Sequence, residues 1–377
     1  MTMASQRQIL EQLLAGWFNS LRDPAAAQDG ALRALLEEYR KTGYGRERGA
    51  AGVSSMADFK KAFPVLGYDR YAPMVQSAVN GDHAYLCSSK PIGYVMTRGT
   101  SGRPKVVPCT QPHLDRVLEC GARELICQAY NTGDTSLVEG YVLNLNFPSI
   151  VKEVPTPDGI VRYGYSSGTY ARLKPTLGMG GLVPSQESID SLGPGITKED
   201  WQRRFELVYN ETKDLPVVAV MGVSPVILSF GRHVRHRHGR TPAELWKMKA
   251  LFCTSVAKIH SIYGPQLQRL FGPAPVREIY SATEGVFGQQ LDAFPYIVPN
   301  YDSYVLEVVM KGKALFLHEM RRGQWGRLVV STPVFPRYDI GDMVECLGPN
   351  YFRIFGRAKP TVVLEHMLYR SVTAWAT

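Results

Sequence analysis

The chain has 377 residues, of which 45% are hydrophobic and 20% are charged. This is an ordinary globular composition, and it excludes a largely disordered or collagen-like protein. The length allows more than one folding unit. The net charge of +9 is dispersed along the chain, which favours an anionic small molecule as ligand over a nucleic acid or a membrane surface.

The cysteines and the apolar segments of the sequence indicate where in the cell the protein is located. The six cysteines form no C-x-x-C pair and lie at no zinc-ligand spacing with a histidine, so we expect reduced thiols in a cytoplasmic protein. No signal peptide is expected at the N-terminus. The longest apolar stretch, residues 215–230, is too short and too punctuated to span a membrane. The basic patch at 232–240 is interpreted as the basic end of a helix rather than a nucleic-acid surface.

In chain order, the first elements are two amphipathic helices within the first forty residues, the second of which ends at residues 42–45. Ser55 and Asp58 predict the cap of a short helix that runs to Phe63. Residues 93–96 read as a strand. Residues 216–221 form a continuous apolar strand of the buried, parallel kind, followed by a helix with Ser224 as its N-cap. With another strand at 276–280, this alternation predicts an α/β fold.

The pattern changes after about residue 299. Short strands are predicted at 304–310, 314–318, 327–332, 343–346 and 351–355, with turns between them. This spacing favours antiparallel hairpins in a small β subdomain. We therefore expect an α/β core with a helical N-terminus over residues 1–298, a small β subdomain over 299–360, and a hinge or tail over 361–377.

The segment with the most chemistry is residues 97–105, Thr-Arg-Gly-Thr-Ser-Gly-Arg-Pro-Lys, directly after the strand at 93–96. Its glycines let several backbone N–H groups point inward, its hydroxyls add donors, and Lys105 adds a positive charge. Such a loop suits a polyphosphate. It is not a Walker A loop, and the alternative interpretation is an ordinary surface turn.

Three further segments contain candidate site residues. Glu284 follows the strand at 276–280, at the edge where α/β sheets bind ligands, and a carboxylate there can hold Mg²⁺ beside phosphates. Asp342, in the segment 337–342, can accept hydrogen bonds from both hydroxyls of a ribose. Arg357 lies on a predicted loop within reach of a phosphate. The alternatives are a solvated loop glutamate, a turn aspartate before a strand at Met343, and a solvated arginine.

Taken together and in this order, the four segments resemble the adenylate-forming superfamily. The sequence is more similar to one branch, the GH3 acyl-acid amido synthetases, which join plant hormones to amino acids. Supporting segments are 42–46, 59–65 with Tyr68, 80–82, 281–288 and 298–301. The resemblance runs from about residue 30 to 360.

The resemblance implies a role for each matched residue. ATP phosphates would be held by Thr97, Arg98, Gly99, Thr100, Ser101, Gly102 and Lys105. Glu284 would bind magnesium, and Asp342 would bind the ribose. Arg357 would be the hinge arginine. The nucleotide would be lined by Tyr280, Ser281, Ala282 and Thr283. The acyl pocket is expected near Gly222, Val223, Ser224, Tyr165 and Ser167.

The implied activity is ATP-dependent activation of a carboxylic acid to an acyl-adenylate, then transfer to an amine. Two departures stand out: Arg98 replaces a serine or threonine, and the sequence ends soon after Arg357, so the family's mobile C-terminal domain is expected to be absent. A separate protein would then be a possible source of the second half-reaction. The alternatives are a thioester ligase that uses coenzyme A or a carrier protein, and an inactive nucleotide-binding scaffold.

Overall fold

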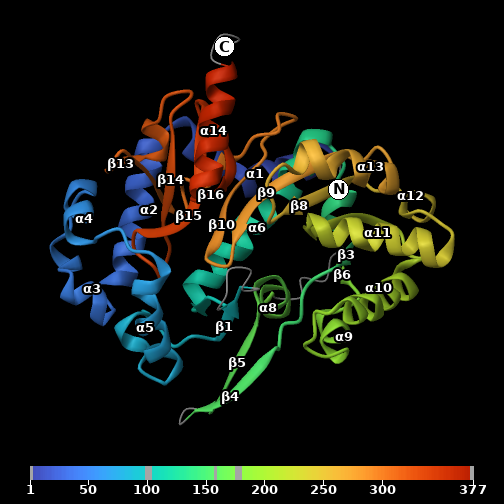
Figure 1. Ribbon diagram of the computed structural model, residues 1–377, viewed down its shortest axis with the longest axis horizontal. Coiled ribbons are helices and arrows are strands. Elements are labelled where there is room, and N and C mark those ends of the chain that lie inside the picture. Colours follow the sequence, from blue (N-terminus) through green and yellow to red (C-terminus); the bar gives the residue numbers. More distant parts are fainter. Residues whose placement is uncertain (1–2, 98–103, 157–158, 175–180, 374–377) are drawn as a thin grey trace.

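Three β-sheets organise the chain in the computed structural model, which describes residues 3–97, 104–156, 159–174 and 181–373 (Figure 1). A four-stranded sheet has the order β2-β1-β5-β4, a seven-stranded sheet the order β11-β10-β9-β8-β7-β3-β6, and a five-stranded sheet the order β13-β12-β14-β15-β16. This is the mixed α/β architecture with a small antiparallel sheet that the sequence predicts, and the fold prediction is confirmed.

Helices form most of the N-terminal region, as α1 (Met3–Arg22), α2 (Pro24–Tyr39), α3 (Gly43–Glu47), α4 (Met56–Ala62) and α5 (Tyr68–Val79), with short 3₁₀ turns at Ala50–Gly52 and His83–Tyr85. Asp23 caps α2 by accepting from Ala26 N at 3.0 Å, and the proline that follows suits the first helical turn. Ser55 caps α4 through Asp58 N at 3.1 Å, as predicted. Thr42, predicted only as part of the end of the second helix, is also the N-cap of α3.

The seven-stranded sheet is formed by β3 (Tyr141–Asn144), β6 (Leu182–Val183), β7 (Val217–Val223), β8 (Ala250–Thr254), β9 (Val276–Ala282), β10 (Gly285–Gln289) and β11 (Val298–Pro299). Strands β6, β3, β7, β8 and β9 are parallel, and β10 and β11 are antiparallel. Both faces are covered, which explains the continuous apolar run of β7. On β8, Ala250 and Phe252 pack into one core cluster, and Leu251 and Cys253 pack into the other.

Helices fill the two sides of this sheet. They are α6 (Gln111–Thr132), α7 (Ser136–Glu139), α9 (Gln186–Ser191), α10 (Lys198–Thr212), α11 (Ser224–His238), α12 (Pro242–Leu245) and α13 (Gly264–Phe271), with a π-helical turn at Ile259–Tyr263. Helix α11 ends in the basic patch, as predicted, but Ser224 is its first residue rather than its N-cap, because the extended cap position falls on Val223. All six cysteines are buried and unpaired.

The four-stranded sheet contains β1 (Gly93–Met96), β2 (Val106–Cys109), β4 (Lys152–Thr156) and β5 (Gly159–Tyr165), and α8 (Ser166–Leu173) follows it. Strand β1 coincides with the predicted strand. Strands β1 and β5 are parallel, with Met96 opposite Tyr165, so residues 97 and 166 leave the sheet at the same edge.

The five-stranded sheet is antiparallel and contains β12 (Val305–Met310), β13 (Lys313–Phe316), β14 (Trp325–Ser331), β15 (Tyr338–Gly348) and β16 (Tyr351–Arg357), with a 3₁₀ turn at Leu317–Glu319. Two predictions at its edge were wrong. Strand β15 begins at Tyr338 rather than Met343, and Arg357 ends a strand rather than lying on a loop. Strand β15 starts early because Tyr338 and Asp339 pair with Val330 and Val329 of β14, and β16 is extended to Arg357 by its pairing with Asp342.

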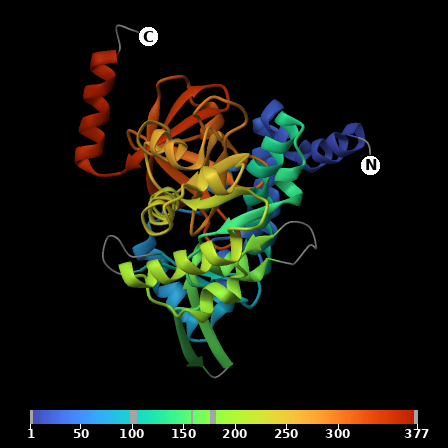
Figure 2. The same cartoon turned by 90° about the vertical axis from the view of Figure 1, so that its right-hand side faces the viewer.

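The last described element is α14 (Pro360–Thr373), where the sequence predicted only a tail. Figure 2 shows this helix projecting beside the five-stranded sheet. Its buried residue His366 stacks on Phe355 at 3.9 Å, whereas Leu364, Met367, Leu368 and Tyr369 are exposed. Among the described residues, no helix combines the length and apolarity that a membrane crossing requires.

Candidate active site

Lys105 and Glu284, which are 179 positions apart in the sequence, meet around the hydroxyl of Tyr338. Lys105 Nζ donates to the Tyr338 hydroxyl oxygen at 2.8 Å and also lies 5.5 Å from the ring centres of Tyr338 and Tyr68. Burial raises the pKa of Glu284, while Lys105 and a hydrogen bond from Tyr338 act in the opposite direction. The three residues come from three different segments, so tertiary folding creates this cluster.

The loop that begins at Thr97 is closed at its base. Thr97 N donates to the Lys105 carbonyl at 2.9 Å, and Lys105 N donates to the Thr97 hydroxyl at 3.0 Å. Directly beyond, Tyr68 exchanges two hydrogen bonds with the backbone of Val106. The predicted phosphate-binding residues within the loop lie outside the described residues: Arg98, Gly99, Thr100, Ser101 and Gly102.

Glu284 occupies a two-residue turn between β9 and β10, since Ala282 pairs directly with Gly285. It is 3% exposed, so it is not the solvated loop glutamate of the alternative interpretation. The neighbouring Thr283 carbonyl accepts from the Tyr170 hydroxyl at 2.8 Å, and Tyr170 contacts His113 Nε2 at 2.8 Å. Burial lowers the pKa of His113 to about 4, so this support for the turn stays neutral at pH 7.

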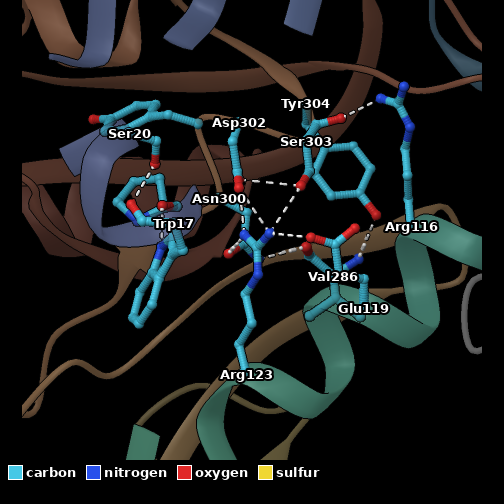
Figure 3. A network of polar contacts seen from close by, with 12 residues as sticks. Trp17, Ser20, Arg116, Glu119, Arg123, Val286, Asn300, Asp302, Ser303 and Tyr304 are labelled. Carbon is cyan, nitrogen blue, oxygen red and sulfur yellow. Dashed lines mark hydrogen bonds and ion pairs between the residues drawn. The ribbon is translucent and has the colours of Figure 1, made fainter. Parts of the chain in front are cut away.

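A buried polar network supports β10 from behind (Figure 3). Arg123 on α6 binds both oxygens of Asp302 at 2.7 Å and the Asn300 side chain at 2.8 Å. From the same segment, the Tyr304 hydroxyl accepts from Val286 N at 3.3 Å, two residues after Glu284. Because Arg123 is 3% exposed and binds Asp302 through both terminal nitrogens, the segment that follows β11 is held against α6.

The predicted ribose residue Asp342 contacts two other predicted site residues. Tyr280 donates to Asp342 Oδ2 at 2.8 Å, and Arg357 Nη1 donates to Oδ1 at 2.8 Å. Asp342 and Arg357 are register partners in β15 and β16, and Asp342 is 8% exposed. Each carboxylate oxygen retains a lone pair for one more donor, so the pair can still receive two hydroxyl groups.

Arg337, in the same segment as Asp342, has a different role. Its guanidinium forms a buried bidentate pair with Glu307 at 2.8 and 3.0 Å and donates to the Phe63 carbonyl at 2.7 Å. Its φ of +48° is in the left-handed region. This fixed residue sets the start of β15 and thereby the direction in which Tyr338 leaves the backbone.

The residues predicted for the acyl pocket lie at two sheet edges. Gly222 and Val223 end β7, where Val223 pairs with Thr254 of β8, and Ser224 begins α11. The Thr254 hydroxyl in turn accepts from Ser281 at 3.3 Å, which joins this edge to the segment 280–284. Tyr165 packs on Phe147 at 5.3 Å, and the Ser167 hydroxyl accepts from Phe147 N at 3.2 Å.

Sequence reasoning gave no site role to Tyr338, Thr254, Tyr170 or His113. Tyr338 lies within the quoted segment 337–342, and its position between Arg337 and Asp342 was an available signal. The other three carry no local pattern, because their contacts join residues 27 to 113 positions apart.

Comparisons with known proteins are consistent with this geometry. Residues 17–191 match the GH3 family N-terminal domain. The putative indole-3-acetic acid-amido synthetase GH3.9 of Arabidopsis thaliana is 32% identical over 138 residues, which cover 36% of this chain and 23% of that protein. The jasmonoyl–L-amino acid synthetase JAR4 of Nicotiana attenuata is 23% identical over 160 residues, which cover 41% of this chain and 27% of that protein. The matches to the first curated relatives span only 15–30% of those proteins.

Solved structures extend the likeness to nearly the whole fold. The acyl acid amido synthetase AtGH3.15 in complex with 2,4-DB superposes with a TM-score of 0.73 at 16% identity, covering 95% of this chain and 71% of that chain. A 2-hydroxyisobutyryl-CoA ligase gives a TM-score of 0.56 at 17% identity, covering 88% of this chain and 74% of the other.

The fold is therefore that of the adenylate-forming enzymes. Residues 17–191 match the GH3 family N-terminal domain, and the chain is similar in sequence and in fold to GH3 acyl acid amido synthetases. The family resemblance inferred from the sequence is confirmed.

Proposed function

We propose that this chain activates a carboxylic acid with ATP and passes the acyl group to an amine, forming an amide. The observation that carries the proposal is the convergence of Lys105, Tyr338 and Glu284 beside the linked set Tyr280, Asp342 and Arg357. The cation of Lys105 suits the phosphates of a nucleotide, the carboxylate of Glu284 suits its metal ion, and the carboxylate of Asp342 suits its ribose.

The donor set of the site fits Mg²⁺. Glu284 is a buried carboxylate whose pKa is raised by burial, and a divalent cation would favour its ionised form. Mg²⁺ is usually held by one or two carboxylates together with phosphate oxygens. We propose Glu284 as its protein ligand; when bound, the ion would neutralise charge on the departing pyrophosphate.

In the proposed first step, a carboxylate oxygen of the acid attacks the α-phosphorus of ATP. The bond between that phosphorus and the bridging oxygen breaks, and pyrophosphate leaves with the electron pair. Lys105 and the loop 97–105 would hold the phosphates, and Lys105 would balance developing negative charge. Asp342 would hold the ribose hydroxyls, while Arg357 and Tyr280 fix the orientation of its carboxylate.

In the proposed second step, an amine nitrogen attacks the carbonyl carbon of the acyl-adenylate, AMP leaves, and the nitrogen loses a proton to solvent. The amine as acceptor is supported by the names of the relatives, which are amido and amino acid synthetases. The expected acyl-pocket residues Gly222, Val223 and Ser224 adjoin the nucleotide segment through Thr254 and Ser281. A cytoplasmic location is proposed from the six unpaired thiols.

The test is an ATP–pyrophosphate exchange assay with a panel of aryl, indolyl and aliphatic acids. We expect exchange that depends on one class of acid and on Mg²⁺, with acyl-adenylate detected by mass spectrometry. Hydroxylamine should trap the activated acid as a hydroxamate. ATP binding without acid-dependent exchange across the panel would instead support the nucleotide-binding scaffold.

A further inference from the structure

Three metal-ligating side chains converge where α10 lies against α11, outside the residues assigned to adenylation (Figure 1). Glu206 lies on α10, and His233 and His238 lie near the basic end of α11. His233 Nε2 is 2.8 Å from Glu206 Oε1, and His238 Nε2 is 3.2 Å from Glu206 Oε2. The three ligand atoms all lie within 4.8 Å of one another.

Both imidazole rings are held by aromatic side chains of the helix that carries Glu206. The ring of His238 stacks on Tyr209 with centroids 3.6 Å apart and an interplanar angle of 10°. The ring of His233 packs on Phe205 at 5.5 Å. These contacts orient the Nε2 atoms toward Glu206 before any ion binds, which reduces the entropy cost of assembling a site.

One nitrogen of the cluster has no hydrogen-bond partner among the described residues. His233 Nε2 forms a hydrogen bond with Glu206, but His238 Nε2 is buried from solvent and makes no hydrogen bond within the described residues. Its 3.2 Å contact with Glu206 therefore lacks hydrogen-bond geometry. A bound cation would use this nitrogen.

We propose that Glu206, His233 and His238 bind a divalent transition-metal ion, with Zn²⁺ as the representative, and that the ion ties α10 to α11. Two imidazole nitrogens and one carboxylate oxygen form a known three-ligand set for zinc, with water as the fourth ligand. Ligand atoms around tetrahedral zinc lie about 3.3–3.5 Å apart, given bonds of about 2.0–2.1 Å. The separations of Glu206 from His233 and from His238, 2.8 and 3.2 Å, are close to that spacing.

The positively charged residues around the cluster favour Zn²⁺ over Mg²⁺ and Ca²⁺. The exposed residues Arg232, Arg235 and Arg237 lie on the same helix end, and Arg237 Nε is 3.8 Å from Glu206. This positive field opposes cations attracted by charge alone, such as Mg²⁺ and Ca²⁺. Zn²⁺ forms strong bonds to neutral imidazole and is less dependent on the field. Arg237 is 73% exposed and is free to turn away when the ion enters.

The experiment is calorimetric titration of the full chain, purified without a histidine tag, with ZnCl₂ at pH 7.5 in a non-chelating buffer. We expect one site per chain and no saturable binding of MgCl₂ in the absence of nucleotide. The cysteines of the folded protein are buried and should not compete. Glu206→Gln and His238→Ala should each weaken zinc binding by about a hundredfold or more, because each removes a direct ligand. His236→Ala is the matched control, since His236 is exposed on the same helix and lies outside the cluster.

A second measurement separates ligand loss from misfolding. Glu206→Gln is nearly isosteric and should retain its circular dichroism spectrum, while zinc should raise the melting temperature of the wild type and not of this variant. The proposal is overturned if the wild type binds no zinc, or if Glu206→Gln and His238→Ala bind it as tightly as His236→Ala does. The result does not depend on adenylation, so either proposal can fail without the other.

Discussion

Replacing Tyr338 with phenylalanine removes one hydroxyl and leaves the ring in its packing site. The ring contacts Phe335 at 5.3 Å and Tyr71 at 6.0 Å, and phenylalanine retains both contacts. The hydroxyl is the group that accepts from Lys105 at 2.8 Å, and its interaction with Glu284 lowers the pKa of that carboxyl. The substitution therefore tests whether the bridge between these two charged groups positions them for catalysis.

The expected magnitude follows from the charges on the two partners. Hydrogen bonds to charged groups contribute about 1.5–3 kcal/mol, and about 1.4 kcal/mol corresponds to a tenfold change in rate. We expect Tyr338→Phe to lower kcat/KM for acid-dependent pyrophosphate exchange by about ten- to a hundredfold. Because the hydrogen bond from Tyr338 lowers the pKa of Glu284, its removal raises that pKa further. The acid limb of the rate profile should therefore move to higher pH.

Tyr39→Phe is the matched control. The Tyr39 hydroxyl is also buried, and it donates to the Thr332 carbonyl at 2.6 Å. Its loss should lower the melting temperature while kcat/KM and the acid limb stay unchanged. The reasoning is refuted if Tyr338→Phe behaves like this control, with a lower melting temperature but normal exchange at every pH.

Four further predictions address the site, the acceptor and the stability of the fold. Glu284→Gln should reduce pyrophosphate exchange by about a thousandfold in a folded protein, because the variant would lose the proposed metal ligand; near-normal exchange would exclude that role. Asp342→Ala should weaken ATP binding by about ten- to a hundredfold in calorimetry; a lower melting temperature with unchanged affinity would indicate a purely structural aspartate. With acceptors at equal concentration, product mass spectrometry should detect amide or hydroxamate in preference to a coenzyme A thioester, and thioester alone would favour the thiol ligase. Burial raises the pKa of Glu278 to about 7, so its proton is held more tightly in the folded state and stability should fall as pH rises from about 4.5 to 7. Glu278→Gln should raise the free energy of unfolding by up to about 3 kcal/mol at pH 8 and have little effect near pH 4; equal denaturation curves at pH 8 would contradict this.

Local patterns in the sequence determined the elements whose stability is local. The Ser55 cap of α4 and the buried strand β7 follow from capping chemistry and from the continuous apolar run at 216–221. The order of the four motifs also indicated the adenylate-forming class, because nucleotide-binding residues cluster in short segments.

The sequence did not predict the element boundaries that pairing between strands determines. Strand β15 begins five residues earlier than predicted because its first residues pair with β14, and Arg357 belongs to a strand because it pairs with Asp342 of β15. Helix α14 also escaped prediction, although His366 anchors it on Phe355. These features depend on strand pairing and ring stacking between neighbouring elements, which the hydrophobic pattern of one element does not reveal.

The site shows the same division. The sequence identified Lys105, Glu284 and Asp342 as separate candidates from the residue types around them. Only the tertiary structure placed the Tyr338 hydroxyl between Lys105 and Glu284, and brought Tyr280 and Arg357 to opposite oxygens of Asp342. The physical reason is that a hydrogen bond between side chains requires their separation to be near 3 Å, and residues far apart in the chain reach that separation only when the sheets that carry them pack together.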